Sequence, residues 1–160
     1  MAVLFDASTD VLFRTTALPV VNGGPYCISF WIYIVTAPTA GDSYQSIVSI
    51  GNNTSSHYDQ LGILRSGANT RLFVASDNGT YHEAVGSTNL SINTWYHIAL
   101  VRSSTTNLTG YLDGASQATV TDAASTQTTT RIDYGVHPQF SSDDFKAVSY
   151  THLRAHETKA

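Results

Sequence analysis

The chain has 160 residues, a length that suits one packed domain rather than two. Only 12% of its residues are charged, with two Glu and two Lys, which argues against a helical or coiled-coil protein. The net charge is −4, and the 8 Lys and Arg residues are scattered singly. We therefore expect neither the basic stripe of a nucleic-acid-binding protein nor a polybasic membrane patch.

Short segments of alternating apolar and polar residues, separated by turn residues, predict an all-β fold. The longest strongly apolar run, 27–35, is much shorter than the about 20 residues of a membrane helix, so we expect no membrane insertion. The expected strands are Val3–Phe5, Val11–Phe13, Tyr26–Val35, Ser46–Ile50, Leu61–Leu64, Arg71–Ala75, Thr80–Ala84, Trp95–Arg102, Leu108–Leu112, Ala118–Thr121 and Ile132–Tyr134.

The segment Tyr26–Val35 is largely apolar on both of its faces. We expect it to lie in the middle of a sheet and to be covered on both sides. The segment Trp95–Arg102 is also expected to be central. Trp31 and Trp95 lie within these apolar segments, so we expect them to pack in the core rather than to serve as platforms for sugars.

Two dipeptides are typical of tight hairpin turns. Asn78-Gly79 and Asp113-Gly114 accept the positive φ angles that a two-residue hairpin requires. Each is expected to join two adjacent antiparallel strands. The segment Thr121–Arg131 has no such turn signal and is expected to be a long surface connection.

Three blocks of sequence resemble laminin-G-like domains of the concanavalin A-like lectin and glucanase superfamily. They are Val3-Leu4-Phe5-Asp6-Ala7-Ser8-Thr9-Asp10, Ile28-Ser29-Phe30-Trp31-Ile32, and Trp95-Tyr96-His97-Ile98-Ala99-Leu100-Val101-Arg102 followed by Gly110-Tyr111-Leu112-Asp113-Gly114. The resemblance implies a two-sheet antiparallel jelly-roll sandwich over 1–147, with a concave face where a glycan binds. It also implies a calcium ion at one rim in some members.

The sequence departs from the family pattern after Phe145-Lys146-Ala147. The family continues with a strand of the type Ile-x-x-Val-Arg-Ile-Tyr, expected beside Val3–Phe5, so the final strand is missing or replaced here. The segment Val148–Thr158 instead resembles one reading frame of the mosaic-end adapter used in transposase-based sequencing libraries. We therefore expect 148–160 to be a non-native, adapter-encoded tail.

The sequence offers no pair of catalytic acids. Glycoside hydrolysis requires two carboxylates that flank the scissile bond. With the tail set aside, Glu83 is the only glutamate, and no Asp or Glu lies within five residues of it. A Ser/His/Asp set that includes His97 and Asp113 lacks a Gly-x-Ser-x-Gly elbow. We expect no enzyme activity, and we expect His97 to be a core or sheet-face residue.

Two polar segments, 52–60 and 77–83, combine amides, carboxylates and tyrosines in the way that sugar sites do. The candidate carbohydrate-binding residues in them are Asn53, His57, Tyr58, Asp59, Asn78, Tyr81 and His82. Ordinary surface loops have a similar composition, so this assignment is a hypothesis.

Calcium is the one metal ion that the sequence leaves open. His and Cys residues lack the spacing of a zinc site, whereas carboxylates from separate loops can surround calcium. The candidate ligands are Asp10, Asp59 and Asp77. The alternative is that these residues only form turns.

Two functions follow from these observations. The first is a non-catalytic carbohydrate-binding or adhesion module of a larger extracellular, cell-surface or virion protein, with a glycan or polysaccharide as its partner. The alternative is a structural or protein-interaction jelly-roll domain of a phage tail or capsid, with protein partners in a multidomain assembly. A surface poor in charge and rich in Ser, Thr and Asn suits both.

Overall fold

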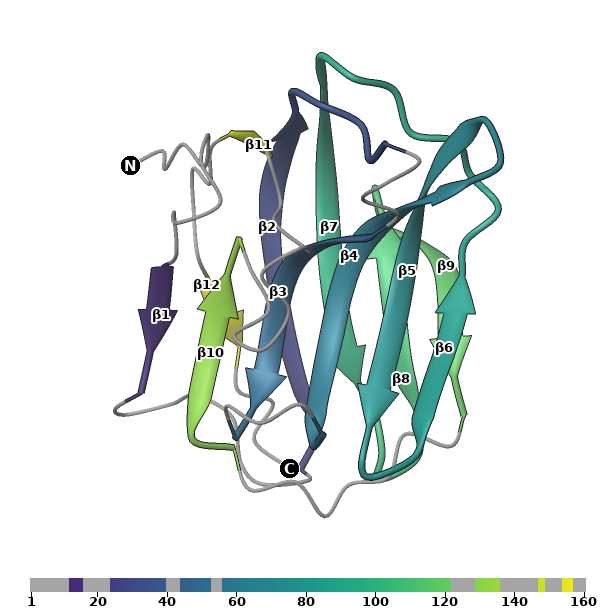
Figure 1. The fold of residues 1–160 in the computed structure, drawn as a ribbon. Coiled ribbons are helices and arrows are strands. Elements are labelled where there is room, and N and C mark those ends of the chain that lie inside the picture. Colours follow the sequence, from purple (N-terminus) through teal and green to yellow (C-terminus); the bar gives the residue numbers. More distant parts are fainter. Residues whose placement is uncertain are drawn as a thin grey trace.

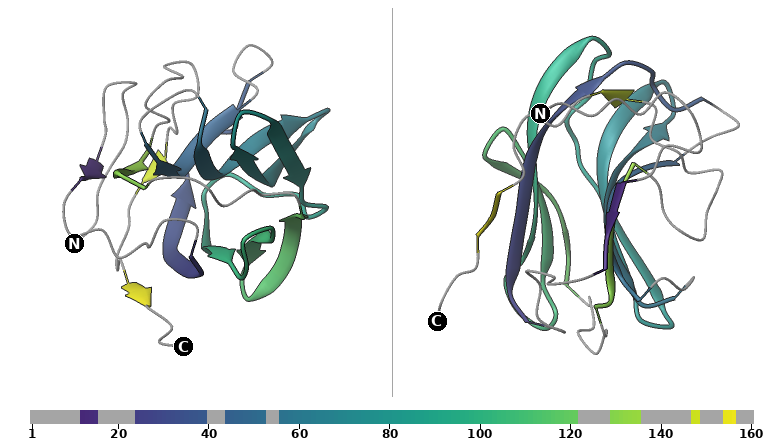
Figure 2. Two further views of the ribbon diagram at one scale, coloured as in Figure 1. Left: turned by 90° about the horizontal axis from the view of Figure 1, so that it is seen from below. Right: turned by 90° about the vertical axis from the view of Figure 1, so that its left-hand side faces the viewer.

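The structure is a computed structural model that describes residues 12–15, 24–39, 44–52, 56–121, 129–135, 147–148 and 154–156. The described residues form two antiparallel sheets that face each other as two layers, which Figure 2 shows edge-on in its right-hand view. All of the regular secondary structure in these residues is β-strand, so the all-β prediction is confirmed. None of the described residues form a helix that is long and apolar enough to cross a membrane.

The first sheet, named the β4 sheet here, has the strand order β1-β10-β3-β4-β5-β6. The second, named the β2 sheet, has the order β11-β2-β7-β8-β9, and β12 also pairs with β2 (Figure 1). The strands are β1 Leu12–Arg14, β2 Tyr26–Ile34, β3 Tyr44–Gly51, β4 Tyr58–Ser66, β5 Asn69–Asp77, β6 Tyr81–Val85, β7 Thr94–Arg102, β8 Leu108–Leu112, β9 Ala115–Val120, β10 Arg131–Tyr134, β11 Ala147–Val148 and β12 Arg154–His156.

Both predicted turns join adjacent antiparallel strands. Asp113 and Gly114 have φ angles of 49° and 84°, and they connect β8 to β9. Leu112 pairs with Ala115, so this turn has the two-residue form that the dipeptide predicts. Asn78-Gly79 connects β5 to β6, but Asp77 pairs with Tyr81, so this loop spans 78–80.

The core lies between the sheets and is built from alternate residues of their strands. From the β2 sheet it receives Ile28, Phe30, Ile32 and Ile34, and from the β4 sheet Ile50, Leu61, Ile63, Leu72 and Val74. An irregularity in the pairing of β3 with β4 lies between Ser46 and Val48. It allows the neighbours Ile47 and Val48 both to be fully buried in this core.

The second face of β2 is not covered, which corrects the prediction made from its apolar sequence. β2 is central, because it pairs with β7 on one side and with β11 and β12 on the other. Its alternate residues nevertheless point away from the core, and Trp31 is 44% exposed. Trp95 on β7 is also 44% exposed, so neither tryptophan belongs to the core. A two-layer sandwich covers only one face of each sheet, and periodicity does not show which face that is.

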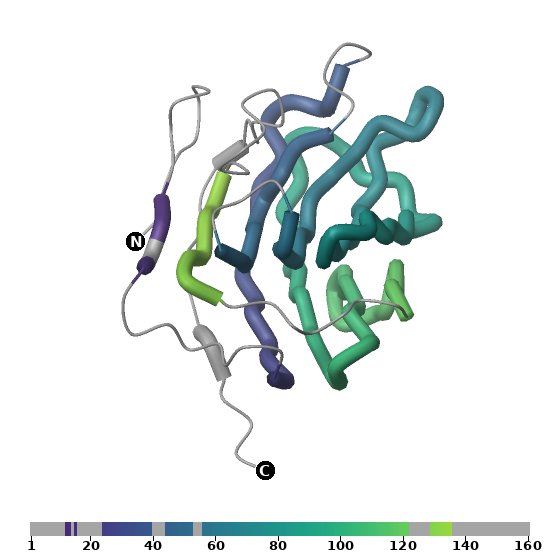
Figure 3. The backbone as a smooth tube through the Cα atoms, turned by 60° about the horizontal axis from the view of Figure 1, so that its bottom comes forward, coloured from purple at the N-terminus to yellow at the C-terminus, as the bar shows by residue number. Residues whose placement is uncertain are grey.

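Segments far apart in the sequence meet at the edge of the β4 sheet. The N-terminal strand β1 pairs with β10, as the tube in Figure 3 shows. The expected strand Val3–Phe5 lies outside the described residues. At the C-terminal end, β11 pairs with Tyr33 and Ile34, and β12 pairs with 27–29, all of them on β2. The described parts of the proposed tail therefore lie beside β2.

Candidate functional site

A row of side chains crosses the outer face of the β4 sheet, which is the face turned away from the β2 sheet. Asp133 pairs with Ser49, and Ser49 pairs with Gln60. Leu61 lies in the core, so the alternation of the strand turns Gln60 and its partners outward. Continuing the pairing to both edges of the sheet defines the polar row, which comprises Phe13, Asp133, Ser49, Gln60, Ala75 and Glu83.

A second row lies two residues along the strands on the same face. Tyr58 pairs with Asp77, and Asp77 pairs with Tyr81 at the edge strand. On the other side, Tyr58 pairs with Gly51, which pairs with Arg131. We call Arg131, Gly51, Tyr58, Asp77 and Tyr81 the tyrosine row. The two rows together place amide, hydroxyl, carboxylate and phenol groups side by side.

The middle of this face is buried while its two edges are exposed. Gln60 is only 4% exposed, and Ser49, Asp133 and Tyr58 are similarly buried. At the edges, Phe13 is 54% exposed and Tyr81 is 48% exposed. The polar residues in the middle therefore form a buried polar floor between two exposed aromatic side chains.

Arg131 joins the two rows at one edge of the face. Its Nε donates a hydrogen bond of 2.5 Å to Oδ1 of Asp133, and its guanidinium lies 4.2 Å from the centre of the Phe13 ring. Burial raises the pKa of Asp133, and the charge and hydrogen bond of Arg131 offset this rise only in part. The negative charge of Asp133 is thus held on the buried polar floor at a cost in free energy.

Tyr81 and Glu83 are linked at the opposite edge. They are two residues apart on one strand and therefore lie on one face. The Tyr81 hydroxyl donates a hydrogen bond of 2.6 Å to Oε2 of Glu83. Partial burial of the phenol raises the pKa of Tyr81 well above its ordinary value, and the hydrogen bond to Glu83 raises it further. Tyr81 therefore stays a neutral phenol whose ring is held in place by its hydroxyl.

Two buried polar atoms on this face have no hydrogen-bond partner in the described part of the chain. They are Nε2 of Gln60 and Oγ of Ser46. Ser46 pairs with Gly62, which lies between the inward-pointing Leu61 and Ile63, so Ser46 also faces outward. Leaving such a group without a partner costs about 1–3 kcal/mol. The face therefore holds two groups that a ligand could satisfy.

Of the predicted sugar-binding residues, the structure brings Tyr58 and Tyr81 together in the tyrosine row. His57 precedes Tyr58, is partly buried and has a φ angle of 84°. Its Nδ1 lies 3.0 Å from Oγ of Ser56. Asn78 accepts a hydrogen bond from the Thr80 amide, so it shapes the turn beside Tyr81. Asn53 lies outside the described residues.

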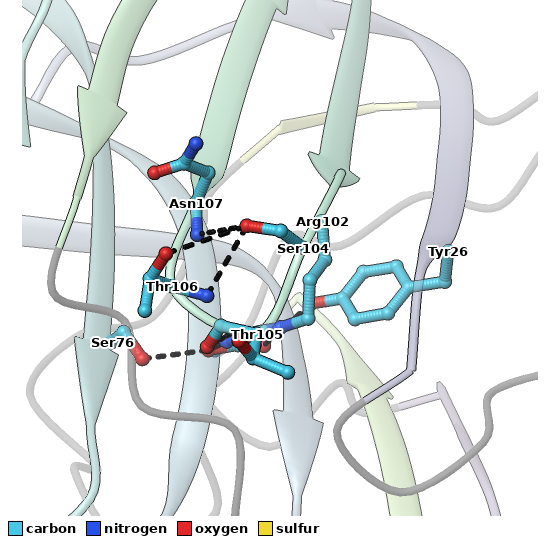
Figure 4. Close-up of polar contacts among 8 residues, drawn as sticks. Tyr26, Ser76, Arg102, Ser104, Thr105, Thr106 and Asn107 are labelled. Atoms are coloured by element: carbon cyan, nitrogen blue, oxygen red, sulfur yellow. Dashed lines mark hydrogen bonds and ion pairs between the residues drawn. The ribbon is translucent and has the colours of Figure 1, made fainter.

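The two remaining candidates, Asp59 and His82, follow Tyr58 and Tyr81 and therefore point to the inner face. The Asp59 carboxylate is buried between the sheets, where it accepts hydrogen bonds of 2.7 Å from Tyr26, 2.8 Å from Ser76 and 2.9 Å from Nε of Arg102 (Figure 4). Asp59 pairs with Ser76 on β5, and Ser76 pairs in turn with His82 on β6. Asp59 is thus separated from the outer face by the sheet itself.

The described residues do not assemble a calcium site. Asp59 and Asp77 lie on opposite faces of the β4 sheet, and Asp77 accepts a hydrogen bond of 2.7 Å from the Gly79 amide. No group of three or more His, Cys, Asp or Glu residues suited to a metal ion exists among the described residues. Asp10 lies outside them. Calcium binding that involves Asp10 and Asp77 stays a prediction.

The order of these strands and their two-layer arrangement agree with comparisons to known proteins. Residues 6–152 match the family described as the concanavalin A-like lectin/glucanases superfamily, in its laminin G group. The chain belongs to this superfamily. No curated protein sequence matches the chain.

Solved structures with the superfamily fold resemble the chain at low sequence identity. The heptameric SAP-like pentraxin of Limulus polyphemus has a TM-score of 0.72 at 12% identity, over 96% of this chain and 74% of that chain. The LG4-5 domains of the mouse laminin α1 chain have a TM-score of 0.73 at 16% identity, over 96% of this chain and 41% of that chain. The CBM40 of the Ruminococcus gnavus IT-sialidase, bound to α2,3-sialyllactose, has a TM-score of 0.61 at 13% identity, over 82% of this chain and 75% of that chain. At these identities the likeness shows the fold alone.

Sequence reasoning missed the floor of the face. Gln60, Ser49 and Asp133 lie in strands rather than in loops, and nothing in the local sequence links them to Glu83. The available signal was alternation, because each of these polar residues lies next to a buried apolar neighbour. The local sequence does not show which strands are neighbours in the sheet.

Proposed function

We propose that the chain is a non-catalytic glycan-binding module, and that the polar and tyrosine rows form its binding face. The observation that carries the proposal is the buried amide of Gln60, whose Nε2 has no partner in the described residues, beside the orphaned hydroxyl of Ser46. A sugar hydroxyl both donates and accepts hydrogen bonds, so it can satisfy either group. Such a ligand would remove the cost of the unpaired atoms.

The aromatic residues at the same place support a sugar rather than another polar ligand. Half-exposed Tyr81 and buried Tyr58 flank Asp77 in the tyrosine row. Aromatic rings offer flat apolar surface to the C–H groups of a pyranose ring. The hydrogen bond to Glu83 holds the Tyr81 ring, so little freedom is lost on binding. A related fold with a bound sialyllactose is consistent with a glycan ligand.

The separation of Glu83 and Asp133 supports binding without hydrolysis. The acid pairs of glycosidases are about 5–9.5 Å apart. Glu83 and Asp133 share the polar row but are four strands apart, which corresponds to about 19 Å at the usual strand spacing. Asp77 is nearer to Glu83, but its carboxylate accepts the Gly79 amide and shapes the hairpin.

The proposal places the module in a larger extracellular, cell-surface or virion protein. A glycan array probed with the purified chain tests it. We expect binding to at least one glycan, and we expect Tyr81→Ala to weaken this binding at least tenfold. Trp95→Ala is the matched control, because it removes an equally exposed aromatic ring from the other sheet. An equal loss of glycan affinity in both variants, or no binding to any glycan, would contradict the proposal.

A second function is favoured by the outer face of the β2 sheet. Trp31 contacts His97 and Tyr33 contacts Trp95, each with ring centres 5.3 Å apart. Protein interfaces are enriched in such aromatic residues and depleted of charge in their centres. This face suits a structural or protein-interaction role, including that of a phage tail or capsid domain. Genes for tail or capsid proteins beside this gene would favour that role.

A further inference from the structure

The described residues of the two rows carry an excess of negative charge. Three carboxylates lie in the two rows, namely Asp77, Glu83 and Asp133, against one guanidinium, that of Arg131. Arg131 is already engaged, because its Nε donates to Asp133 and its guanidinium lies over the Phe13 ring. The rows therefore offer no unpaired cation to an incoming anion among the described residues.

Among the residues that the structure describes, the next cation on this face is too distant to compensate. Arg71 pairs with Leu64 and lies four residues from Ala75 on β5, which corresponds to about 13 Å along the strand. Charges that far apart at the protein surface are largely screened at physiological ionic strength, where the screening length is about 8 Å. Nε of Arg71 also lies 3.4 Å from Oδ1 of Asn89, to which it donates a hydrogen bond.

The uncharged groups of the floor match hydroxyls. The Gln60 amide offers donors from Nε2, and the Ser46 hydroxyl can donate or accept. The carboxylates can accept hydrogen bonds from sugar hydroxyls. A sugar carboxylate, in contrast, only accepts hydrogen bonds, and it is usually recognised by a free Arg or Lys. Beside Glu83 it would meet like charge.

We propose that this face selects uncharged glycans and rejects glycans that carry a carboxylate, such as sialylated ones. The inference rests on the proposed function and names its ligand class. It separates this chain from the structurally similar module that holds sialyllactose. Glu83 is the residue that sets this selectivity, because it lies at the partly exposed edge where a ligand enters.

Matched pairs of array glycans, identical except for a terminal sialic acid, test the inference. For each pair that binds, we expect the sialylated glycan to bind at least tenfold more weakly than the neutral one at low salt. We expect added NaCl to reduce this difference in affinity. Glu83→Gln should raise affinity for sialylated members at least threefold relative to their neutral counterparts. Asp113→Asn is the control, because it alters an exposed turn carboxylate at the β8–β9 hairpin. It should leave the ratio of sialylated to neutral affinity unchanged.

The outcomes distinguish the inference from the proposed function. Binding of sialylated members as tight as that of neutral ones overturns the charge selection and leaves a glycan-binding module. If Glu83→Gln leaves the ratio of sialylated to neutral affinity unchanged, Glu83 does not set the selectivity. No binding to any member of any pair overturns the proposed function and this inference with it.

Discussion

Arg102 on β7 and Asp59 on β4 form a buried ion pair that joins the two sheets. Nη2 of Arg102 lies 2.5 Å from Oδ1 of Asp59, and both side chains are almost fully buried. Burial by itself would lower the pKa of Arg102, but the hydrogen bonds and charge of Asp59 outweigh it and raise that pKa. Nη1 of Arg102 also donates a hydrogen bond to the carbonyl of Thr105, in the turn whose Ser104 hydroxyl accepts hydrogen bonds from the amides of Thr106 and Asn107 (Figure 4).

Removing one partner of this pair should destabilise the fold strongly. We expect Asp59→Ala to lower the free energy of unfolding by about 3–5 kcal/mol, because it leaves the Arg102 charge buried without its partner. Replacing both residues, as Asp59→Leu with Arg102→Met, should cost less than the sum of the single changes. Urea denaturation measures each value, with Asp113→Asn as an exposed control. A loss below about 1 kcal/mol in Asp59→Ala would show that the pair does not hold the sheets together.

The raised pKa of Asp133 predicts a pH dependence. Because the folded state binds the Asp133 proton more tightly than the unfolded state does, this carboxyl contributes less stability as the pH rises through its raised folded-state pKa. Asp133→Asn removes this loss. The stability of the variant relative to the parent chain should therefore increase as the pH rises above about 4, the ordinary pKa of an aspartate, by at most about 1.4 kcal/mol per pH unit, and should level off above the folded-state pKa. Urea titrations of both proteins over this range measure it, and a difference that does not vary with pH contradicts the prediction.

Truncation of two neighbouring residues on β2 should lower the stability of the fold by different amounts. Phe30 is fully buried, whereas Trp31 is largely on the outer surface. We expect Phe30→Ala to cost about 3–5 kcal/mol through the cavity that it leaves. Trp31→Ala loses the contact with His97 and part of a half-exposed side chain, so it should cost less, about 1 kcal/mol. Chemical denaturation compares the two, and equal costs would mean that the second face of β2 is covered in solution.

The proposed adapter-encoded tail predicts a stability deficit. The described residues of β11 pair with 33–34 of β2 and those of β12 with 27–29, in the place where the expected tail replaces the final strand of the family. Strand edges without a suitable partner promote aggregation. Replacing 148–160 by a final strand of the family type Ile-x-x-Val-Arg-Ile-Tyr should raise the denaturation midpoint and reduce aggregation. Midpoint and light scattering measure the two effects. If both proteins have equal midpoints and equal solubility, a native final strand was never needed.

Much of the fold can be predicted from the sequence alone because it depends on local chemistry. Alternation along 26–34 and 94–102 determines that these segments are strands, since residues at every second position share a face. Asp113-Gly114 determines a tight hairpin, because both residues adopt the left-handed conformation at low cost. The same local reasoning placed Tyr58 and Tyr81 in a common candidate site.

Only the tertiary structure decided which faces are covered and which strands are neighbours. Trp31 and Asp59 show this most clearly, because an apolar residue proved exposed and a polar residue in a predicted site proved buried. Their surroundings depend on the layer packed against each sheet, which periodicity does not contain. The polar row likewise joins Asp133 to Glu83 across strands from distant parts of the chain. Strand order arises from long-range pairing, so a site on a sheet face is not visible in any single segment.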